Sequence, residues 1–417
     1  MSFFRIFLYL KIFYFLISFF KNKKNIENEI CKKFNKITKK KYSILTSHLR
    51  VGFYLVLKYL KLVNPEKNEI IISSYNLAEM VNICENLKLK LVFSKLNKNL
   101  SLSSNDLIKD INKKTLCVVT TNIFNDQNDI IDVKKICKKN NIPLIEDNAI
   151  YFGNYYKTKK IKVFAGSFGD YTLHSFNIMK NISGMFGGMV STNNKDFLNY
   201  ARNEIKNFKR FPFLKYFFQC QTFLILKVLS NNFIYKPIFL PLTKWAHKNN
   251  INYVLKILYP SLKFKKTIIP NNYFTKISRF SLNMIWLQLE DIKYFKSIQQ
   301  TKEKNNLFYY RELKKKNIKG VKLIKLNTST FQNFNDFPII VERKNELLKY
   351  LLSNGVETKF IQYVDCQKIF NNIKRSNKNF YENKILCLPN HIKIKENYIN
   401  FIVYLISDFY KKKIKSF

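Results

Sequence analysis

Short apolar runs alternate with helical patterns from about residue 68 to residue 192. Five runs bounded by turn residues are typical of buried strands, and they cover residues 69–74, 89–94, 116–121, 143–147 and 187–192. Between them, apolar residues repeat at helical spacing, as at Ile130, Val133, Ile136 and Cys137. Strands that alternate with helices predict an α/β fold, in which a mostly parallel sheet is flanked by helices.

The C-terminal third repeats this alternation on a smaller scale. It begins with a predicted long connecting helix, whose apolar face is formed by Leu282, Ile285, Leu289, Ile292 and Phe295. Strands are predicted at 336–342 and 356–361, with a helix between them that Gly355 ends. A last helix is predicted at about 395–411. The pattern therefore predicts a small C-terminal α/β domain after the large one.

Two apolar tracts lie outside this alternation. Residues 1–20 are almost all apolar or aromatic, but Arg5 and Lys11 interrupt them. Charges inside the tract disfavour a spanning helix and favour a helix at the membrane interface whose cations reach the water. The lysine cluster at 21–24 favours a cytoplasmic position for the rest of the chain. The second tract, 211–240, fits a buried helical pair and a second membrane contact equally well.

These patterns divide the chain into three predicted parts. Residues 1–24 form an apolar, membrane-associated segment. Residues 25–280 form the large domain, with an aromatic insertion near 206–270. Residues 281–417 contain the connecting helix and the small domain.

Charge and cysteine content narrow the class of protein. The 417 residues include 73 Lys and Arg against 28 Asp and Glu, a formal net charge of +45. This charge is spread along the whole chain and accompanies abundant Asn, Ile and Phe, which indicates a genome-wide compositional bias. Nucleic-acid binding is therefore not predicted. The seven cysteines are odd in number and contain no CxxC pair, which favours reduced thiols in the cytoplasm. The four histidines lie far apart, and no metal site is predicted.

Residues with catalytic potential lie where ligands of parallel sheets bind, just after the apolar runs. Asp147 ends "LIED"; an aspartate there most often caps a turn, but it could also pair with a cationic nitrogen of a ligand. Ser175 and Lys180 follow in "HSFNIMKNISGMFGG". In so basic a chain a lysine is most often a solvated surface residue, but apolar neighbours and glycines indicate that this loop is partly buried. Desolvation lowers the pKa of a lysine, and a neutral amine is the form that makes a Schiff base.

The order of several segments resembles the DegT/DnrJ/StrS family of pyridoxal-phosphate-dependent nucleotide-sugar aminotransferases. These segments are "IIISSYN", "PLIEDNAIYFGNYY", "GSFGDYTLHSFNIMKNISGMFGGMVSTNN" and "ILCLPNH". The resemblance runs from about residue 40 to residue 205 and, more weakly, from about residue 275 to the C-terminus. It implies the aspartate-aminotransferase fold of type I, a homodimer, and pyridoxal 5'-phosphate as the cofactor.

The resemblance also implies roles for individual residues. Lys180 matches the lysine that binds the cofactor covalently and then moves protons, and Asp147 matches the partner of the pyridine nitrogen. Ser175 matches a ligand of the cofactor phosphate. The helix in "TSHLRVGFYLVLKYL" is expected to hold the same phosphate at its N-terminus. Within it, Gly52 is expected to let the backbone approach the phosphate, and Arg50 to add positive charge.

Four positions depart from the family pattern. At Ile150, a cofactor-binding position, family members carry Gln or His, and isoleucine cannot hydrogen-bond the cofactor hydroxyl. Val51 replaces a residue with a hydroxyl group, and Leu77 replaces an aromatic ring. The segment "FTKIS", residues 274–278, lacks the asparagine that family members lend across the dimer. We therefore do not extend the family's cofactor contacts or its substrate preference to this chain.

The resemblance implies an aminotransferase that moves an amino group, with glutamate as the expected donor, onto a keto sugar nucleotide. The expected product is an amino sugar for a surface polysaccharide, either lipopolysaccharide O-antigen or capsule. The expected location is the cytoplasm, in contact with the inner-membrane surface. Two alternatives stay open: a pyridoxal-phosphate enzyme acting on a non-sugar substrate, and a degenerate, non-catalytic, membrane-associated scaffold. The retained Lys180 argues against the family's dehydratase branch, where histidine takes that place.

Overall fold

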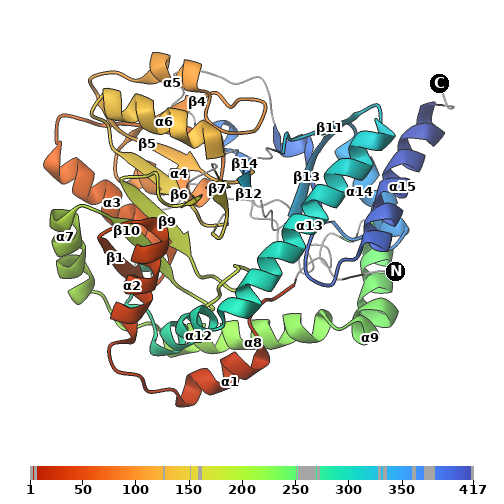
Figure 1. Ribbon diagram of the computed structural model, residues 1–417, viewed down its shortest axis with the longest axis horizontal. Coiled ribbons are helices and arrows are strands. Elements are labelled where there is room, and N and C mark those ends of the chain that lie inside the picture. Colours follow the sequence, from red (N-terminus) through yellow and green to blue (C-terminus); the bar gives the residue numbers. More distant parts are fainter. Residues whose placement is uncertain are drawn as a thin grey trace.

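The computed structural model of the chain has a seven-stranded sheet with helices on both faces and a smaller sheet in its C-terminal part (Figure 1). It describes residues 3, 7–124, 127–150, 152–157, 162–249, 251, 269, 273–326, 330–331, 336–358, 363–370 and 381–414.

The large sheet has the strand order β1-β10-β9-β6-β5-β2-β4. Its strands are β1 (Tyr42–Thr46), β2 (Glu69–Ser73), β4 (Lys90–Ser94), β5 (Thr115–Thr121), β6 (Leu144–Asp147), β9 (Tyr171–Ser175) and β10 (Gly188–Thr192). All neighbours from β9 to β4 run parallel, whereas β10 is antiparallel to both β9 and β1. Strands covered on both faces need apolar residues at successive positions, as Ile70, Ile71 and Ile72 of β2 provide.

Helices cover both faces of this sheet. Residues of α3 (Leu49–Val63), α4 (Ala78–Asn86) and α7 (Lys195–Lys206) pack on one face, in a cluster that includes Ile72 and Leu173. The other face is covered by α2 (Ile26–Thr38), α5 (Ser104–Asp110), α6 (Gln127–Lys139) and α12 (Arg279–Glu290). The predicted fold class is therefore confirmed, and the five predicted strands of the large domain are all present.

The C-terminal part has its own sheet and core. Helix α13 (Ile292–Lys316) leads to an antiparallel sheet of β11 (Val321–Leu323), β13 (Asp336–Val341) and β15 (Ile385–Pro389). This sheet packs with α14 (Lys344–Ser353) and α15 (Glu396–Ile414) in a second large hydrophobic cluster. The predicted C-terminal strand at 336–342 and both helices are confirmed. The predicted domain boundaries stay predictions.

Short strands and turns lie between the large domain and the C-terminal part. Strand β14 (Val364–Asp365) pairs with β3 (Tyr75–Asn76), which joins the C-terminal part to the large sheet. A second small sheet contains β12 (Thr330–Phe331), β7 (Tyr155–Lys157) and β8 (Lys162–Phe164). Two 3-10 turns cover Cys366–Lys368 and Tyr381–Asn383.

Two predictions for the C-terminal third are wrong. The connecting helix breaks at Asp291, whose side chain accepts a hydrogen bond from the Tyr294 N–H and so begins α13 as a new helix. The apolar periodicity runs through this break, which is why the sequence predicts one helix. Residues 356–358 are not a strand, and the rest of that predicted strand, 359–361, lies outside the described residues.

The N-terminal tract forms only a short helix, α1 (Ile12–Phe20). Lys11, which was expected to reach the water, instead forms an ion pair with Asp291 at 2.7 Å and lies over the Tyr294 ring. The Lys11 hydrogen bond lowers the pKa of the Asp291 carboxyl to about 2. The cation in this tract therefore fastens α1 to the start of α13.

The second apolar tract forms α8 (Phe213–Leu229), α9 (Asn232–Ile234), a π-helical turn (Tyr235–Phe239) and α10 (Leu240–Lys248). In α8 only Tyr216 and Phe223 are buried, so the prediction of a buried helical pair is wrong for this helix. Across the described part of the chain, no single helix is both long and apolar enough to cross a membrane. The pair Phe213–Leu229 and Asn232–Lys248, bent by 71°, meets that criterion by length and composition only.

Candidate active site

Asp147 is the last residue of β6, and its carboxyl group is buried at the carboxyl end of that strand. Burial raises the pKa of this carboxyl from 3.8 to about 6. The Ala149 N–H, which donates to Oδ1 at 3.0 Å, and the charge of Lys180 oppose this rise. A carboxylate in this position therefore favours a further cationic partner.

Glu146, the other carboxylate of "LIED", has a structural role. Successive side chains of a strand point to opposite faces, so Glu146 faces away from Asp147. Its carboxylate accepts hydrogen bonds from the backbone N–H groups of Gly166, Phe168 and Gly169. Of the two carboxylates in "LIED", only Asp147 thus belongs to the candidate site.

The register of the sheet places Ser175 beside the start of α3. Ser175 ends β9 and pairs with Gly188 of β10, which in turn pairs with Thr46 of β1. His48, two residues after Thr46, is the residue before α3 and bridges to the β10 end of the sheet. Asp147 pairs with Leu173, two residues before Ser175, a displacement of roughly 7 Å along the strand. The aspartate, the serine and the helix N-terminus therefore share one edge of the sheet.

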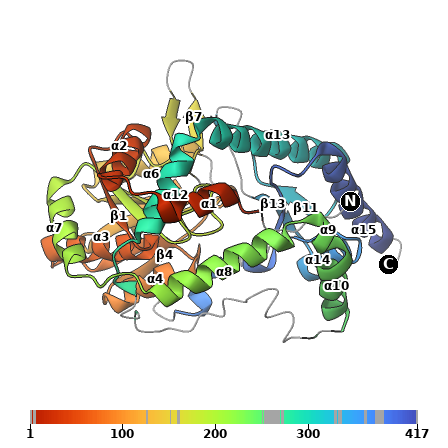
Figure 2. The ribbon, with the colours of Figure 1, turned by 90° about the horizontal axis from the view of Figure 1, so that it is seen from below.

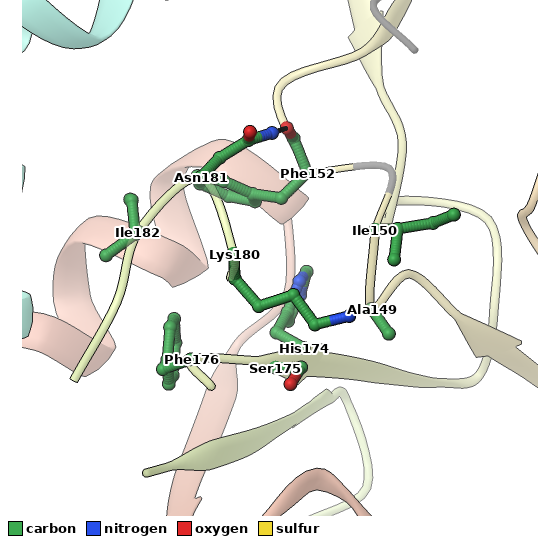
Figure 3. Close-up of a pocket in the computed structure, with 9 residues that line it drawn as sticks. All are labelled: Ala149, Ile150, Phe152, His174, Ser175, Phe176, Lys180, Asn181 and Ile182. Carbon is green, nitrogen blue, oxygen red and sulfur yellow. Dashed lines mark hydrogen bonds between the residues drawn. The ribbon is translucent and has the colours of Figure 1, made fainter. Parts of the chain in front are cut away.

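Lys180 lies in the loop between β9 and β10 and lines a cavity at this edge. The other lining residues are Ala149, Ile150, Phe152, His174, Ser175, Phe176, Asn181 and Ile182. Figure 3 shows the lysine side chain extended across the cavity, with its amino group directed toward Ala149 and Ile150. The predicted Lys180, Ser175 and Ile150 are thus brought together.

Asn181 holds the lysine loop in place. Its Nδ2 donates to the carbonyl oxygen of Phe152 at 3.2 Å, as the dashed line in Figure 3 marks. Its Oδ1 accepts from Nζ of Lys302 at 2.6 Å, a lysine of α13 with no exposed surface. The loop is therefore fixed from both the turn after β6 and helix α13.

Positive charge gathers at the N-terminus of α3. Arg50 forms an ion pair with Glu79 at 2.6 Å and lies over the ring of Tyr273. Lys215 of α8 lies against the rings of Phe186, Phe211 and Tyr273. Burial, and then the charge of Arg50, lower the pKa of the Lys215 ammonium. Arg50 and Lys215, set against the single carboxylate of Glu79, leave a net positive charge beside the helix N-terminus, which favours a bound anion.

Two glycines allow α3 to approach the sheet. A Cβ on Gly188 would lie 2.3 Å from the backbone nitrogen of Leu49. A Cβ on Gly52 would lie 2.7 Å from Cγ2 of Val190, so its missing side chain makes room for β10. The expected close approach of Gly52 to a phosphate thus has a second explanation in helix packing. Neither Gly52 nor Arg50 lines the Lys180 cavity.

The departures from the family pattern occupy packed positions. Ile150 lines the cavity and packs against the core of the C-terminal part. Val51 is 1% exposed inside the large-domain core, and Leu77, the residue before α4, packs against that core. In the 274–278 segment, Phe274 packs on Tyr54 of the same chain.

Sequence reasoning missed two residues near the site. Lys215 lies in the aromatic tract, which the resemblance does not cover, and no local signal separates it from other lysines. Tyr363 precedes β14; burial and then the charge of Asp147 raise the pKa of its phenol, so the two groups are close. The pairing of β14 with β3 brings Tyr363 there, and such long-range pairing has no signature in the local sequence.

The edge of the large sheet thus holds Lys180 and Asp147 beside the N-terminus of α3. Residues 18–211 match the model of the DegT/DnrJ/EryC1/StrS aminotransferase family. Slightly less than half of the chain, all of it outside the C-terminal part, is therefore similar to this family.

Curated relatives are similar in sequence to part of the chain, and solved structures are similar to it in fold. The chain is 29% identical to GDP-perosamine synthase of Vibrio cholerae over 161 residues, which are 38% of this chain and 42% of the relative. It is 26% identical to UDP-4-amino-4,6-dideoxy-N-acetyl-beta-L-altrosamine transaminase of Helicobacter pylori, over 32% of this chain and 34% of the relative. These matches span less than half of the relatives' length.

The whole fold is similar to that of Helicobacter pylori PseC, an aminotransferase involved in the biosynthesis of pseudoaminic acid. That likeness has a TM-score of 0.72 at 14% identity and covers 99% of this chain and 100% of the other. It extends the shared fold to the C-terminal part, beyond the residues that the family model matches.

Proposed function

We propose that this chain is a pyridoxal-phosphate-dependent aminotransferase that acts on a keto sugar carried by a nucleotide. The observation that carries the proposal is the position of Lys180 in one cavity with Ser175, at the sheet edge where Asp147 is buried. Residues 18–211 match an aminotransferase family, and the relatives named above act on nucleotide-linked sugars by their names. Glutamate is the proposed amino donor, and a homodimer is the proposed assembly.

The charge distribution around the site fits this cofactor. Asp147 is a buried anion at one end, and α3, Arg50 and Lys215 make the other end positive. Pyridoxal phosphate has the complementary arrangement, with a pyridinium nitrogen at one end and a phosphate at the other. Ala149 and Ile150 offer apolar contact for a ring between these ends.

Pyridoxal phosphate, once bound, supplies an electron sink for bond breaking at the substrate carbon. In the proposed reaction Nζ of Lys180 would hold the cofactor, and the same amine would move a proton. The Asp147 carboxylate would keep the pyridine nitrogen protonated. Oγ of Ser175 and the first N–H groups of α3 would hold the phosphate. Ile150 contributes shape but no hydrogen bond.

The proposed product is an amino sugar for a surface polysaccharide, O-antigen or capsule. A cytoplasmic location, at the inner-membrane surface, is part of the proposal. The seven cysteines support a reducing compartment, because all of them are free thiols.

The test is turnover on a panel of keto sugar nucleotides with glutamate as donor, followed by mass spectrometry of the amino sugar. Lys180→Arg is expected to lose activity by roughly a hundred-fold or more, because it removes the proton-carrying amine. Lys113→Arg, which alters an exposed lysine, is the matched control and is expected to keep full activity.

Three outcomes separate the alternatives. Amino sugar formed by the wild type and lost only in Lys180→Arg supports the proposal. Conversion of one equivalent of glutamate to 2-oxoglutarate, with the amino group left on the cofactor and no amino sugar formed from any member of the panel, indicates a different acceptor, such as a non-sugar substrate. Failure of the wild type to bind the cofactor at all indicates the scaffold and contradicts the proposal.

A further inference from the structure

Exposed apolar side chains concentrate on α1 and on the α8–α10 tract. Sixteen of the 22 large hydrophobic side chains that are exposed among the described residues lie in these helices. Phe13 of α1 and Phe218 of α8 are 63% and 61% exposed. So large an exposed apolar area on a folded protein indicates an interaction surface.

Helices α1 and α8 form one layer of the molecule. They lie at the bottom of Figure 1 and nearest the viewer in Figure 2. Their inner sides share a hydrophobic cluster, in which the rings of Phe15 and Phe223 are 5.1 Å apart. Nζ of Lys227 donates to the carbonyl oxygen of Leu8 at 2.7 Å. The two helices are thus packed together and still expose apolar residues on their outer sides.

We define the docking surface as the exposed apolar residues of this layer. They are Ile12, Phe13, Leu16, Phe19, Phe20, Phe213, Leu214, Phe217, Phe218, Leu224, Ile225 and Val228. In α1 they recur at i, i+1, i+4, i+7 and i+8, the spacing of one helix face. Helix α8 is therefore apolar on two sides, one buried and one exposed.

The docking surface lies in segments without acidic residues. Residues 1–26 and 205–289 contain no Asp or Glu, although the chain has 28 of them. The same segments contain 5 and 14 Lys and Arg residues. Basic residues around an apolar helix face are typical of helices that lie on anionic bilayers.

Acidic residues that approach this layer from other elements are neutralised. Asp291 pairs with Lys11, and Glu290 pairs with Lys33 at 2.5 Å. Glu29 pairs with Lys23 at 2.9 Å. The field around the docking surface is therefore positive.

We propose that the docking surface binds the surface of an anionic phospholipid bilayer. The positive charge around the docking surface favours a bilayer over a second copy of the chain as the binding partner. Two copies would bring two positively charged surfaces together, which costs energy, whereas anionic headgroups complement the positive charge. The layer lies on the bilayer and does not cross it.

The same layer supports the lysine loop of the candidate active site. Ile178, Met185 and Phe186 of that loop share the hydrophobic cluster with α1 and α8. Nε2 of Gln219 in α8 donates to the Met185 carbonyl oxygen at 3.4 Å. A bilayer bound at the docking surface would therefore lie one helix layer from the loop that carries Lys180.

Co-flotation with lipid vesicles tests this proposal on the full chain. Phosphatidylglycerol mixed with phosphatidylcholine provides the anionic vesicles, and pure phosphatidylcholine the neutral ones. The wild type is expected to float with anionic vesicles and to bind neutral ones more weakly. Added salt should weaken the binding, because it screens the positive charge around the docking surface.

A pair of double variants separates the docking surface from general charge. Phe13→Glu with Phe218→Glu removes two apolar contacts and should weaken binding to anionic vesicles roughly ten-fold or more. Leu62→Glu with Leu307→Glu is the matched control, since these side chains are 65% and 56% exposed on other elements. Both variants add two negative charges. The control is expected to bind within about three-fold of the wild type.

Two results would overturn the proposal. One is a wild type that does not bind anionic vesicles. If the wild type is then a dimer and the Phe13→Glu, Phe218→Glu variant is a monomer, the surface binds a second copy of the chain. The other is equal loss of binding in both double variants, which would indicate attraction by charge alone. Circular dichroism checks folding of every variant. The visible spectrum of bound cofactor in the same samples keeps this test separate from that of the proposed function.

Discussion

At the scale of single residues, burial makes the ionised form of the Asp147 carboxyl unfavourable, and a bound cation would offset that cost. Its pKa of about 6 lies above the ordinary 3.8, so folding favours the protonated form. Its contribution to the cofactor-free protein is therefore greatest below pH 3.8 and is lost as the pH rises through 6.

Asp147→Asn is expected to stabilise the cofactor-free protein above pH 6, by on the order of 3 kcal/mol. The amide oxygen can still accept from Ala149, and no charge is buried. Urea unfolding on either side of pH 6 measures the difference. Added pyridoxal phosphate should stabilise the wild type more than the variant. The same pH dependence in both proteins would show that Asp147 is not the titrating group.

The sequence predicts Asp147 because it ends a recognisable apolar run, and it predicts Ser175 and Lys180 through the resemblance, since β9 is not among the five predicted strands. A strand's end and the loop after it are local features, so their place at the sheet edge follows from the fold class. Lys215 and Tyr363 approach from α8 and from the segment before β14. Tertiary packing alone decides their position.

At the scale of elements, the close packing of α3 against β10 depends on Gly188 and Gly52. Gly188→Ala places a methyl group against backbone atoms of His48 and Leu49, which cannot move without shifting the helix N-terminus. Gly52→Ala meets side-chain atoms instead, Cγ2 of Val190 at 2.7 Å and Oγ1 of Thr46 at 3.6 Å. We expect Gly188→Ala to cost roughly 3 kcal/mol of unfolding free energy and Gly52→Ala about 1 kcal/mol.

Urea denaturation measures both stabilities, and titration with pyridoxal phosphate measures cofactor affinity. Gly188→Ala should also weaken cofactor binding, because it displaces the helix end proposed to hold the phosphate. If Gly52→Ala weakens binding more than Gly188→Ala, the phosphate lies against Gly52 and the packing explanation is wrong.

Helices and strands could be predicted where the apolar periodicity determines them. They could not be predicted where a hydrogen bond determines the end or the direction of an element. The apolar face from Leu282 to Phe295 is continuous, and the break at Asp291 depends on one side chain that caps the next helix. The antiparallel direction of β10 also has no local signal. It follows from the short return of the chain after the Lys180 loop.

At the scale of the whole molecule, the C-terminal part completes the core of the large domain. The Cys366 N–H donates to the carbonyl oxygen of Ser74 at 2.8 Å, and Cys366 and Phe370 are buried in the large-domain cluster. The segment that contains Tyr363 is thus fixed against the sheet that contains Asp147.

Phe370→Ala is expected to lower the free energy of unfolding by about 3–5 kcal/mol and to weaken cofactor binding, because it loosens this segment. Leu351→Ala, buried in the C-terminal cluster, is the control. It should lower stability by about 2–5 kcal/mol and leave cofactor affinity unchanged. Unchanged affinity in Phe370→Ala would show that the segment does not shape the site.

The central claim is that Lys180 binds pyridoxal phosphate. It is tested most directly by loading the purified chain with the cofactor, reducing it with borohydride and mapping the tryptic peptides by mass spectrometry. The account predicts a pyridoxyl group on Lys180, with no comparable labelling of other lysines and none at this site in Lys180→Arg. A chain that keeps Lys180 unmodified, or carries the label evenly over its many lysines, would contradict it.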